Sequence, residues 1–383
     1  MKKIIYVLVV MFFIATFFII GNREKEIVSS FEKEEIKAIF LSYIEINKYI
    51  KNNSLSKNNI DLIINNLSKD NFNLVLLHVR SFSDSIYNSK IFPNYLNVEY
   101  DVLEYFIKKA HSKNIMVHAC INPYRISSDK NFVIEKNHPA YDFLNTNSIK
   151  RLDNGVYYNP ASLDVTDLIV SGVEEIVSNY DVDGIIFDDY FYPSKDIDND
   201  DYLLYKDSGG NLSLSEYRLN NISSMIERVY LSIKNINKNV LFGISPQGNI
   251  SNNYNNEYLD VKKILREENY IDYIMPQIYF GFENSNKPFI DTLNEWNSLI
   301  LNENIMLIPA FSLYKSGGID KYAGSGLNEW INDTDIIKRQ IVFSRNVSNY
   351  KGFSIFRYDH FYNSTNSNMK VEVSNVKKVL LLD

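Results

Sequence analysis

The sequence predicts an α/β protein, a (β/α)8 TIM barrel with long βα loops, preceded by an N-terminal signal or anchor segment. From Glu35 onwards, short apolar and β-branched runs alternate with longer amphipathic segments, which is the pattern of repeated βα units. The short runs are apolar throughout, as expected of parallel strands buried on both faces. An open doubly wound sheet is disfavoured, because its first strand normally leads into a glycine-rich phosphate loop, and this chain continues with Ser42-Tyr43-Ile44-Glu45.

Residues 1–22 are predicted to be a signal peptide or a signal-anchor. Lys2 and Lys3 precede an uninterrupted apolar run from Ile4 to Ile20, the arrangement of an export signal. The run is long for a signal-peptide core and short for a relaxed membrane span, and no small-x-small cleavage site follows it cleanly. We therefore favour an uncleaved anchor over a cleaved peptide, and both over a buried core helix. Residues 23–34 then form a linker, and the barrel occupies residues 35–383 on the extracytoplasmic face of the membrane or in the cell wall.

Eight strands are expected, in the order of the chain. They are Ile36–Leu41, Leu74–Val79, Ile115–Ile121, Gly184–Asp188, Val240–Ser245, Tyr273–Gln277, Ile305–Phe311 and Gly352–Arg357. Helical patterns lie between them, with apolar residues mostly at i, i+3 and i+4. The clearest are Asp101–Lys113, Val165–Asn179, Glu216–Lys234, Lys287–Leu301 and Asp335–Asn349. The longest gap separates the third and fourth strands and is expected to form part of a cleft at the carboxyl ends of the strands. A second insertion, Ser194–Ser213, is acidic and asparagine-rich, and we expect a solvated loop there or a mobile flap.

Composition excludes several classes of function. The 383 residues carry a formal net charge of −7 without a long basic run, which disfavours a nucleic-acid partner. The single cysteine, Cys120, excludes an internal disulfide framework and a cysteine-based zinc knuckle. No cofactor is expected. A metal site formed by His78, His118 and the nearby aspartates is disfavoured, because the chain has only five histidines and no His-x-His at the first strand. His118 is expected to be a hydrogen-bonded residue of the barrel interior.

Polar residues gather where the predicted strands end, which is where barrels bind their substrates. The expected substrate-binding residues are Tyr43, Glu45, Arg80, Asp84, Asn122, Tyr124, Arg125, Tyr190, Gln277 and Arg357. Carboxylates, amides and aromatic rings in one cleft are typical of a carbohydrate site, since aromatic faces stack on sugar rings.

The sharpest local signal is the end of the fourth strand, where Asp188 and Asp189 follow an apolar run and precede three aromatic residues. Two carboxylates this close do not both ionise easily, so one of them is expected to hold a proton. Such a carboxyl can donate a proton to a leaving oxygen, as glycoside cleavage requires. The competing reading is structural: one aspartate caps the following segment while the other pairs with Arg80 or Arg125.

Several stretches resemble the family-10-like glycosyl hydrolases, a bacterial group of cell-envelope (β/α)8 proteins. The resemblance is spread over most of the chain after Ile36 and is carried by Ala38–Tyr43, Val79–Tyr87, Val117–Arg125, Asp183–Pro193, Gly243–Gly248 and Asp272–Tyr279. The chain departs from the family pattern at Cys120, where a Trp is common, and at Ile186, where a His is frequent.

The resemblance implies cleavage of bacterial cell-wall glycan, especially peptidoglycan strands without their peptides. Each sugar of that substrate carries an acetamido group, and the adjacent aspartates are similar to the pair of acetamido-assisted hexosaminidases. By that analogy Asp188 orients the acetamide, Asp189 is the general acid, and Tyr279 steadies the acetamide. Gln277-Ile278-Tyr279 is similar to the Met-x-Tyr segment of family-18 chitinases, but their strand-four motif ends in Glu where this chain has Tyr190.

Two alternatives stay open at this point. Glu45 or Asp359 could supply a second carboxylate for an ordinary retaining or inverting mechanism. The protein could also be a non-catalytic envelope barrel that binds glycan. In either case the expected partners are a cell-wall polysaccharide and, if the N-terminal segment is uncleaved, the membrane.

Overall fold

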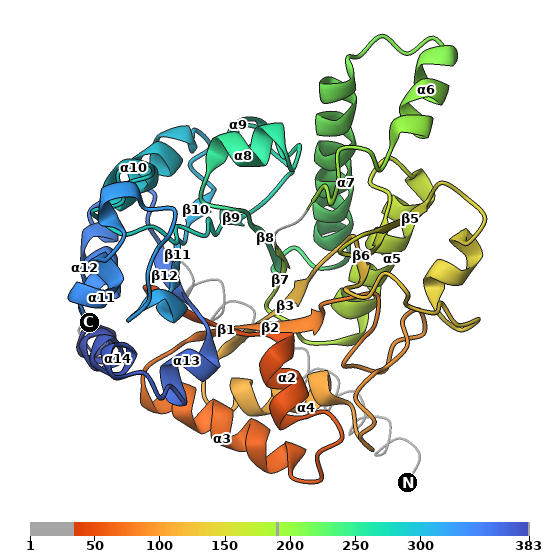
Figure 1. Ribbon diagram of the computed structural model, residues 1–383. Helices are drawn as coiled ribbons and strands as arrows, with labels where there is room; N and C mark the ends of the chain where they lie inside the picture. Colours follow the sequence, from red (N-terminus) through yellow and green to blue (C-terminus); the bar gives the residue numbers. More distant parts are fainter. Residues whose placement is uncertain (1–33, 189–190, 382–383) are drawn as a thin grey trace, which may run out of the picture.

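The computed structural model describes residues 34–188 and 191–381 of the chain. Its main feature is a curled parallel sheet surrounded by helices (Figure 1). The strands of this sheet are β1 (Ile36–Leu41), β2 (Leu74–Arg80), β3 (Met116–Ile121), β7 (Gly184–Asp188), β8 (Leu241–Ser245), β9 (Tyr273–Ile274), β10 (Met306–Leu307), β11 (Ala310–Ser312) and β12 (Gly352–Phe356). The helices are α2 (Tyr43–Tyr49), α3 (Ser56–Lys69), α4 (Val102–His111), α5 (Leu163–Asn179), α6 (Asn199–Asp207), α7 (Leu214–Ile236), α8 (Ile250–Asn255), α9 (Val261–Ile264), α10 (Phe289–Leu299), α11 (Glu329–Asn332), α12 (Ile336–Ser344), α13 (Tyr358–Tyr362) and α14 (Ser367–Leu380).

The sheet has nine strands in the order β10-β9-β8-β7-β3-β2-β1-β12-β11. The seventh predicted strand is divided at Ile308 and Pro309 into β10 and β11, which are the first and last strands of this order. Backbone hydrogen bonds link this run to both neighbours, since Ile308 N–H donates to the Ile274 carbonyl and Ser354 N–H donates to the Pro309 carbonyl. The predicted parallel α/β class is confirmed, and the curled sheet is consistent with a TIM barrel.

Side chains alternate along the strands between the interior of the curled sheet and the helix layer. A small inner cluster contains Phe40, Leu76, Cys120 and Tyr273, and a much larger cluster joins the outer strand faces to the helices. Two interior strand positions are glycine because aromatic rings from neighbouring strands occupy the place where a side chain would lie. A Cβ on Gly184 would lie 2.6 Å from the His118 ring, and one on Gly243 would lie 2.3 Å from the Tyr273 ring. The Tyr273 hydroxyl lies 2.8 Å from His118 Nδ1, which confirms His118 as a hydrogen-bonded interior residue.

The two predicted insertions both have ordered structure. The long segment after β3 contains a three-stranded antiparallel sheet in the order β4-β6-β5, made by β4 (Arg125–Ser127), β5 (Ile149–Leu152) and β6 (Gly155–Tyr158). The Ser194–Ser213 segment contains α6, and a buried ion pair anchors it, because Arg218 of α7 lies 2.7 Å from Asp198. The segment therefore forms a helix rather than a plain loop, α6 has no buried residue, and the expectation of a mobile flap stays a prediction.

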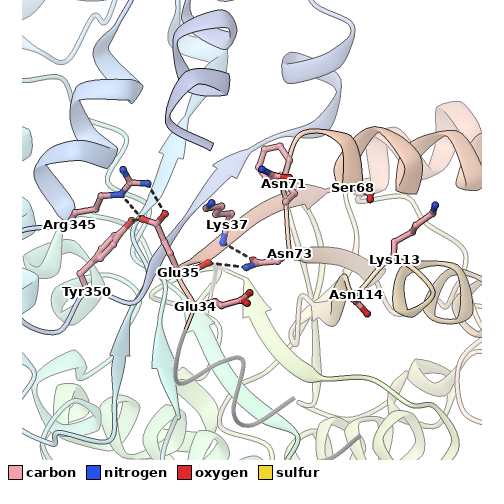
Figure 2. A pocket seen from close by; sticks show the side chains of 11 residues that line it. Glu34, Glu35, Lys37, Ser68, Asn71, Asn73, Lys113, Asn114, Arg345 and Tyr350 are labelled. Atoms are coloured by element: carbon pink, nitrogen blue, oxygen red, sulfur yellow. Dashed lines mark hydrogen bonds and ion pairs between the residues drawn. The ribbon is translucent and has the colours of Figure 1, made fainter. Parts of the chain in front are cut away.

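A pocket of about 980 Å³ lies at the amino ends of the strands, beside the start of β1 (Figure 2). Its polar walls are internally bonded: Arg345 lies 2.7 Å from the Glu35 carboxylate, the Tyr350 hydroxyl donates to the same carboxylate, and Asn73 binds both the Lys37 N–H and the Glu35 carbonyl. Barrel active sites form at the opposite, carboxyl-terminal face. The size of this pocket therefore does not identify it as the active site.

The predicted signal or anchor, residues 1–22, lies outside the described residues, as does the linker up to residue 33. Across 34–188 and 191–381, no helix has both the length and the apolar character needed to cross a membrane.

Candidate active site

Asp188 ends β7 and belongs to the set of side chains that face the interior of the sheet. Its carboxylate is contacted by residues from two other parts of the barrel. Gln277 Nε2, just beyond β9, donates to Asp188 Oδ1 at 3.1 Å, and His78 Nε2 of β2 lies 3.3 Å from Oδ2. The side chain of Asp188 is 13% exposed. A nitrogen thus lies near each oxygen, and a small part of the carboxylate remains exposed.

The surroundings of His78 favour an imidazole that orients Asp188 over one that binds a metal. His78, Cys120 and Asp188 do offer possible ligand atoms within 4.8 Å of one another. However, the Tyr43 backbone N–H donates to His78 Nδ1 at 3.3 Å. An accepting Nδ1 places the proton of a neutral imidazole on Nε2, which lies close to Asp188 but makes no hydrogen bond within the described chain.

Rings and a guanidinium from the ends of the first three predicted strands lie together at the carboxyl end of the barrel. The Tyr43 ring lies 5.6 Å from the Phe82 ring and 6.2 Å from the His78 ring, centroid to centroid. The Arg125 guanidinium lies 5.7 Å from the Phe82 centroid. The structure therefore brings together the predicted residues Tyr43 and Arg125, with Phe82 between them.

A second aromatic group comes from the last three predicted strands. The Tyr279 ring lies 6.0 Å from Tyr314 and 6.1 Å from Phe356, and Tyr314 is 43% exposed. Lys315 fixes the adjoining backbone, because its ammonium group donates to the Tyr279 carbonyl at 2.6 Å and lies 2.7 Å from Asp320. Tyr279 is thus held beside Gln277, the residue that contacts Asp188.

Glu45 and Arg357 bind one another. The Glu45 carboxylate is buried, pairs with the Arg357 guanidinium, and accepts hydrogen bonds from the backbone N–H groups of Ser42 and Asp359. It closes the capping box of α2. Asp359 is also committed, since it lies 2.9 Å from Lys48. The structure therefore assigns Glu45 to local stability and corrects its expected role in substrate binding or as a second catalytic carboxylate.

Arg80 points away from the cleft, contrary to expectation. Simple alternation would direct it inward beside His78, but the register of β2 against β3 shifts between these two residues. This bulge re-aims the side chain. Its guanidinium lies 4.1 Å from the Phe92 centroid, against Gly172 of α5, where a Cβ would lie 1.9 Å from Nη1.

Three more predicted contacts are buried to different degrees. Tyr124 is 1% exposed and packs in the outer hydrophobic cluster, so its expected contact with a sugar is corrected. Asn122 is 7% exposed, with Nδ2 donating to the Ser81 carbonyl and Oδ1 unpartnered within the described chain. Burial raises the pKa of Asp84 to about 6, and Lys51 and Arg80 are the charged groups that oppose this shift. Asp189 and Tyr190 lie outside the described residues.

The site also includes residues that strand ends alone do not reveal. His78 was expected only as an interior residue or metal candidate, yet it contacts Asp188. Phe82 was not singled out, although it lies two residues beyond β2 and contacts both Tyr43 and Arg125. Its position just beyond a strand end, next to other aromatic residues, is the signal that could have identified it.

Comparison with known proteins agrees with this geometry. The family described as glycosyl hydrolase-like 10 matches residues 35–316. Glycosyl hydrolase YngK of Bacillus subtilis (strain 168) is 28% identical over 322 residues, which are 76% of this chain and 61% of that protein. Glycosyl hydrolase DigH of Escherichia coli (strain K12) is 28% identical over 333 residues, 78% of this chain and 74% of that protein.

The fold is also similar to a solved structure. The PgaB (BpsB) glycoside hydrolase domain from Bordetella bronchiseptica superimposes with a TM-score of 0.60, covering 91% of this chain and 99% of that chain at 12% sequence identity. At that identity the likeness concerns the fold alone.

Proposed function

The chain belongs to the glycosyl hydrolase-like 10 family, and on that premise we propose that it is a glycoside hydrolase acting on bacterial cell-wall glycan. The observation that carries the proposal is the placement of Asp188. It is a carboxylate at the carboxyl end of a barrel strand, with the Gln277 amide donating to one oxygen, His78 Nε2 3.3 Å from the other, and aromatic side chains at other strand ends. Rings and fixed carboxylates are the groups that glycosidases use to hold a sugar and cleave its bond.

The substrate we propose is the peptide-free peptidoglycan strand, whose sugars each carry an acetamido group. In this mechanism Asp188 accepts the acetamide N–H and orients the group, so that the acetamide oxygen attacks the anomeric carbon. Asp189 donates a proton to the leaving oxygen as the glycosidic bond breaks. Tyr279 donates a hydrogen bond to the acetamide, while Tyr43, Phe82 and Arg125 hold neighbouring sugars.

We further propose that the protein works outside the cytoplasm, on the outer face of the membrane or in the cell wall. The support is the N-terminal sequence, in which two lysines precede a long apolar run. A fluorescent or epitope tag at the C-terminus that stays protected from external protease in spheroplasts would overturn this location.

The function is tested by incubating the purified full-length chain, in detergent, with peptide-stripped glycan strands, intact cell wall and chitin oligomers. We expect fragments from the stripped strands, and mass spectrometry of their ends identifies the bond. Asp188→Asn, which keeps the size of the side chain but removes the anionic carboxylate, should abolish the fragments. Retention of the strands without cleavage by both proteins would instead identify a glycan-binding barrel.

A further inference from the structure

We propose that Glu257, in the segment between α8 and α9, is a second catalytic carboxyl of this cleft and the base that activates water. The inference rests on the proposed hydrolysis and adds a residue that lies twelve positions from the nearest strand end, Ser245 of β8. Four observations support it, and they concern placement, available partners, backbone conformation and the alternatives.

Placement comes from two neighbouring glutamines. Gln247 and Gln277 form a parallel bridge just beyond β8 and β9. Each donates a side-chain N–H to a carboxylate, Gln277 to Asp188 at 3.1 Å and Gln247 to Glu257 at 3.1 Å. Since paired strands lie about 5 Å apart, this bridge places Glu257 on the same edge of the barrel as Asp188.

The second observation is that Glu257 is held without a cation. Its hydrogen-bond partners among the described residues are the Gln247 amide and the Tyr192 backbone N–H, which lies 3.5 Å from the other carboxylate oxygen, and no ion pair involves it there. Burial raises the pKa of Glu257, and the Tyr192 N–H only partly opposes this. A carboxylate with a raised pKa is a stronger base than an ordinary one.

The backbone next to Glu257 is strained. Tyr258 has a φ of +49°, a left-handed conformation that is rare for an aromatic residue. A buried network maintains it: the Arg218 guanidinium donates to the Tyr258 hydroxyl at 2.9 Å, and the Tyr192 ring lies 5.0 Å from the Tyr258 ring. Strain of this kind persists where the surroundings impose a specific position, often at functional sites. Here the imposed position is that of the Glu257 side chain.

The alternatives near the cleft are already committed. Glu45 binds Arg357, Asp359 binds Lys48, Asp320 binds Lys315, and Asp198 binds Arg218. Asp84 is not ion-paired among the described residues, but its charged neighbours are Lys51 and Arg80, and Arg80 faces the helix layer. Glu257 is therefore the described carboxylate best placed for a second role.

The step assigned to Glu257 is the second half of the reaction. After the acetamide oxygen has bonded to the anomeric carbon and the leaving sugar has departed, a water oxygen attacks that carbon. The bond from the carbon to the acetamide oxygen breaks, its electron pair returns to the acetamide, and the water proton passes to Glu257. Proton exchange with solvent then restores the Glu257 carboxylate and the Asp189 acid. The configuration at the anomeric carbon is retained after the two displacements.

The test uses the full-length chain with Glu257→Gln and, as a matched control, Asp260→Asn. Asp260 lies three residues away and caps α9 by accepting the Lys263 N–H, so the control changes a nearby carboxylate without entering the cleft. We expect Glu257→Gln to slow cleavage of stripped glycan about 10²- to 10⁴-fold, and Asp260→Asn to leave it unchanged. Azide needs no base, so it should restore turnover of Glu257→Gln at least tenfold and yield a glycosyl azide.

The outcomes separate the two proposals. A wild-type protein that does not cleave glycan overturns the hydrolysis itself. Cleavage by Glu257→Gln at the wild-type rate overturns the role of Glu257 while leaving the hydrolysis intact. A slow Glu257→Gln variant that azide does not rescue identifies a structural residue and also overturns the assignment.

Discussion

Charged side chains are paired at both ends of the barrel, but the two ends differ in how completely their buried polar atoms are hydrogen-bonded. At the amino end, charged side chains are paired: Lys234 lies 2.7 Å from Asp272, and His111 lies 2.8 Å from Asp183. At the carboxyl end, several buried polar atoms have no hydrogen-bond partner within the described chain, among them Asn122 Oδ1, Ser245 Oγ and Ser312 Oγ. Buried polar atoms are normally satisfied. The carboxyl end is therefore the face whose polar groups are available to a ligand.

This contrast shows that the larger pocket is not the one whose polar groups are available to a ligand. The 980 Å³ pocket at the amino end has the room, but Glu35, Arg345 and Tyr350 bind one another there (Figure 2). Around Asp188 the fixed carboxylate and the exposed rings are arranged so that a further group can approach. Three predictions test whether the two ends differ in this way.

The largest effect is expected from the two ends of one strand, β7. Asp188→Asn should lower the rate of glycan cleavage by about 10²- to 10⁴-fold, because the anionic carboxylate that orients the acetamide is lost. Asp183→Asn, at the amino end of the same strand, should leave kcat within a few-fold of wild type. Initial rates with stripped glycan strands measure both, and equal losses in the two variants would remove the distinction between the ends.

For stability the order of the two variants should reverse, with Asp183→Asn losing more than Asp188→Asn. Asp183 is buried and accepts hydrogen bonds from the Val117 N–H at 2.7 Å and from His111 at 2.8 Å. Asp183→Asn should therefore lower the free energy of unfolding by about 1.5–3 kcal/mol. Asp188→Asn should change it by less than about 1 kcal/mol, because this carboxylate lies at the open cleft. Urea unfolding followed by circular dichroism measures both, and a larger loss for Asp188→Asn contradicts the comparison.

The smallest expected effect concerns how the unfolding free energy depends on pH, for which Glu35 and Asp84 should act in opposite directions. Burial alone would raise the pKa of Glu35, but hydrogen bonds from Arg345 and Tyr350 outweigh it and lower that pKa. Its stabilisation is therefore present above pH 4.5 and is lost as the pH falls. The pKa of Asp84 is raised to about 6, mainly by burial, so its contribution is present below about pH 4 and is lost as the pH rises through 6.

Unfolding free energies measured from pH 4 to pH 7 test this pair. At pH 7, Asp84→Asn should be more stable than wild type by about 1–2 kcal/mol, while Glu35→Gln should be less stable by about 1 kcal/mol. Both differences should shrink towards pH 4. Differences that do not change with pH would show that neither carboxyl titrates in the way its surroundings indicate.

Much of the scaffold was predictable, because the cause of each strand is local. Runs such as Ile36–Leu41 and Gly184–Asp188 are apolar, short and flanked by polar turns, and the structure has strands with these bounds. The strand at Ile305–Phe311 was predicted as one element and is split at Ile308 and Pro309. Pro309 has no N–H to donate to the sheet, and this was the local signal for the break.

The candidate site was predictable only in part. Asp188 and Gln277 were identified from their positions at strand ends, and the structure brings them into contact. Arg80 was expected by the same rule, but a bulge turns it into the helix layer. Glu257 could not be found in this way, because it lies in a segment between two short helices rather than at a strand end.

By itself the sequence determined the α/β class, most strands of the curled sheet, the family and the position of the aspartate at the end of the fourth strand. These depend on hydrophobic periodicity and on residues close to one another along the chain, whose effects act locally. Only the tertiary structure decided which carboxylates form ion pairs and which groups surround the others. Glu45 is neutralised by Arg357, more than three hundred residues away, and Asp188 is oriented by His78 and Gln277 from other strands. Electrostatic partners act through space, so their pairing exists only once the sheet has curled and brought the strand ends together.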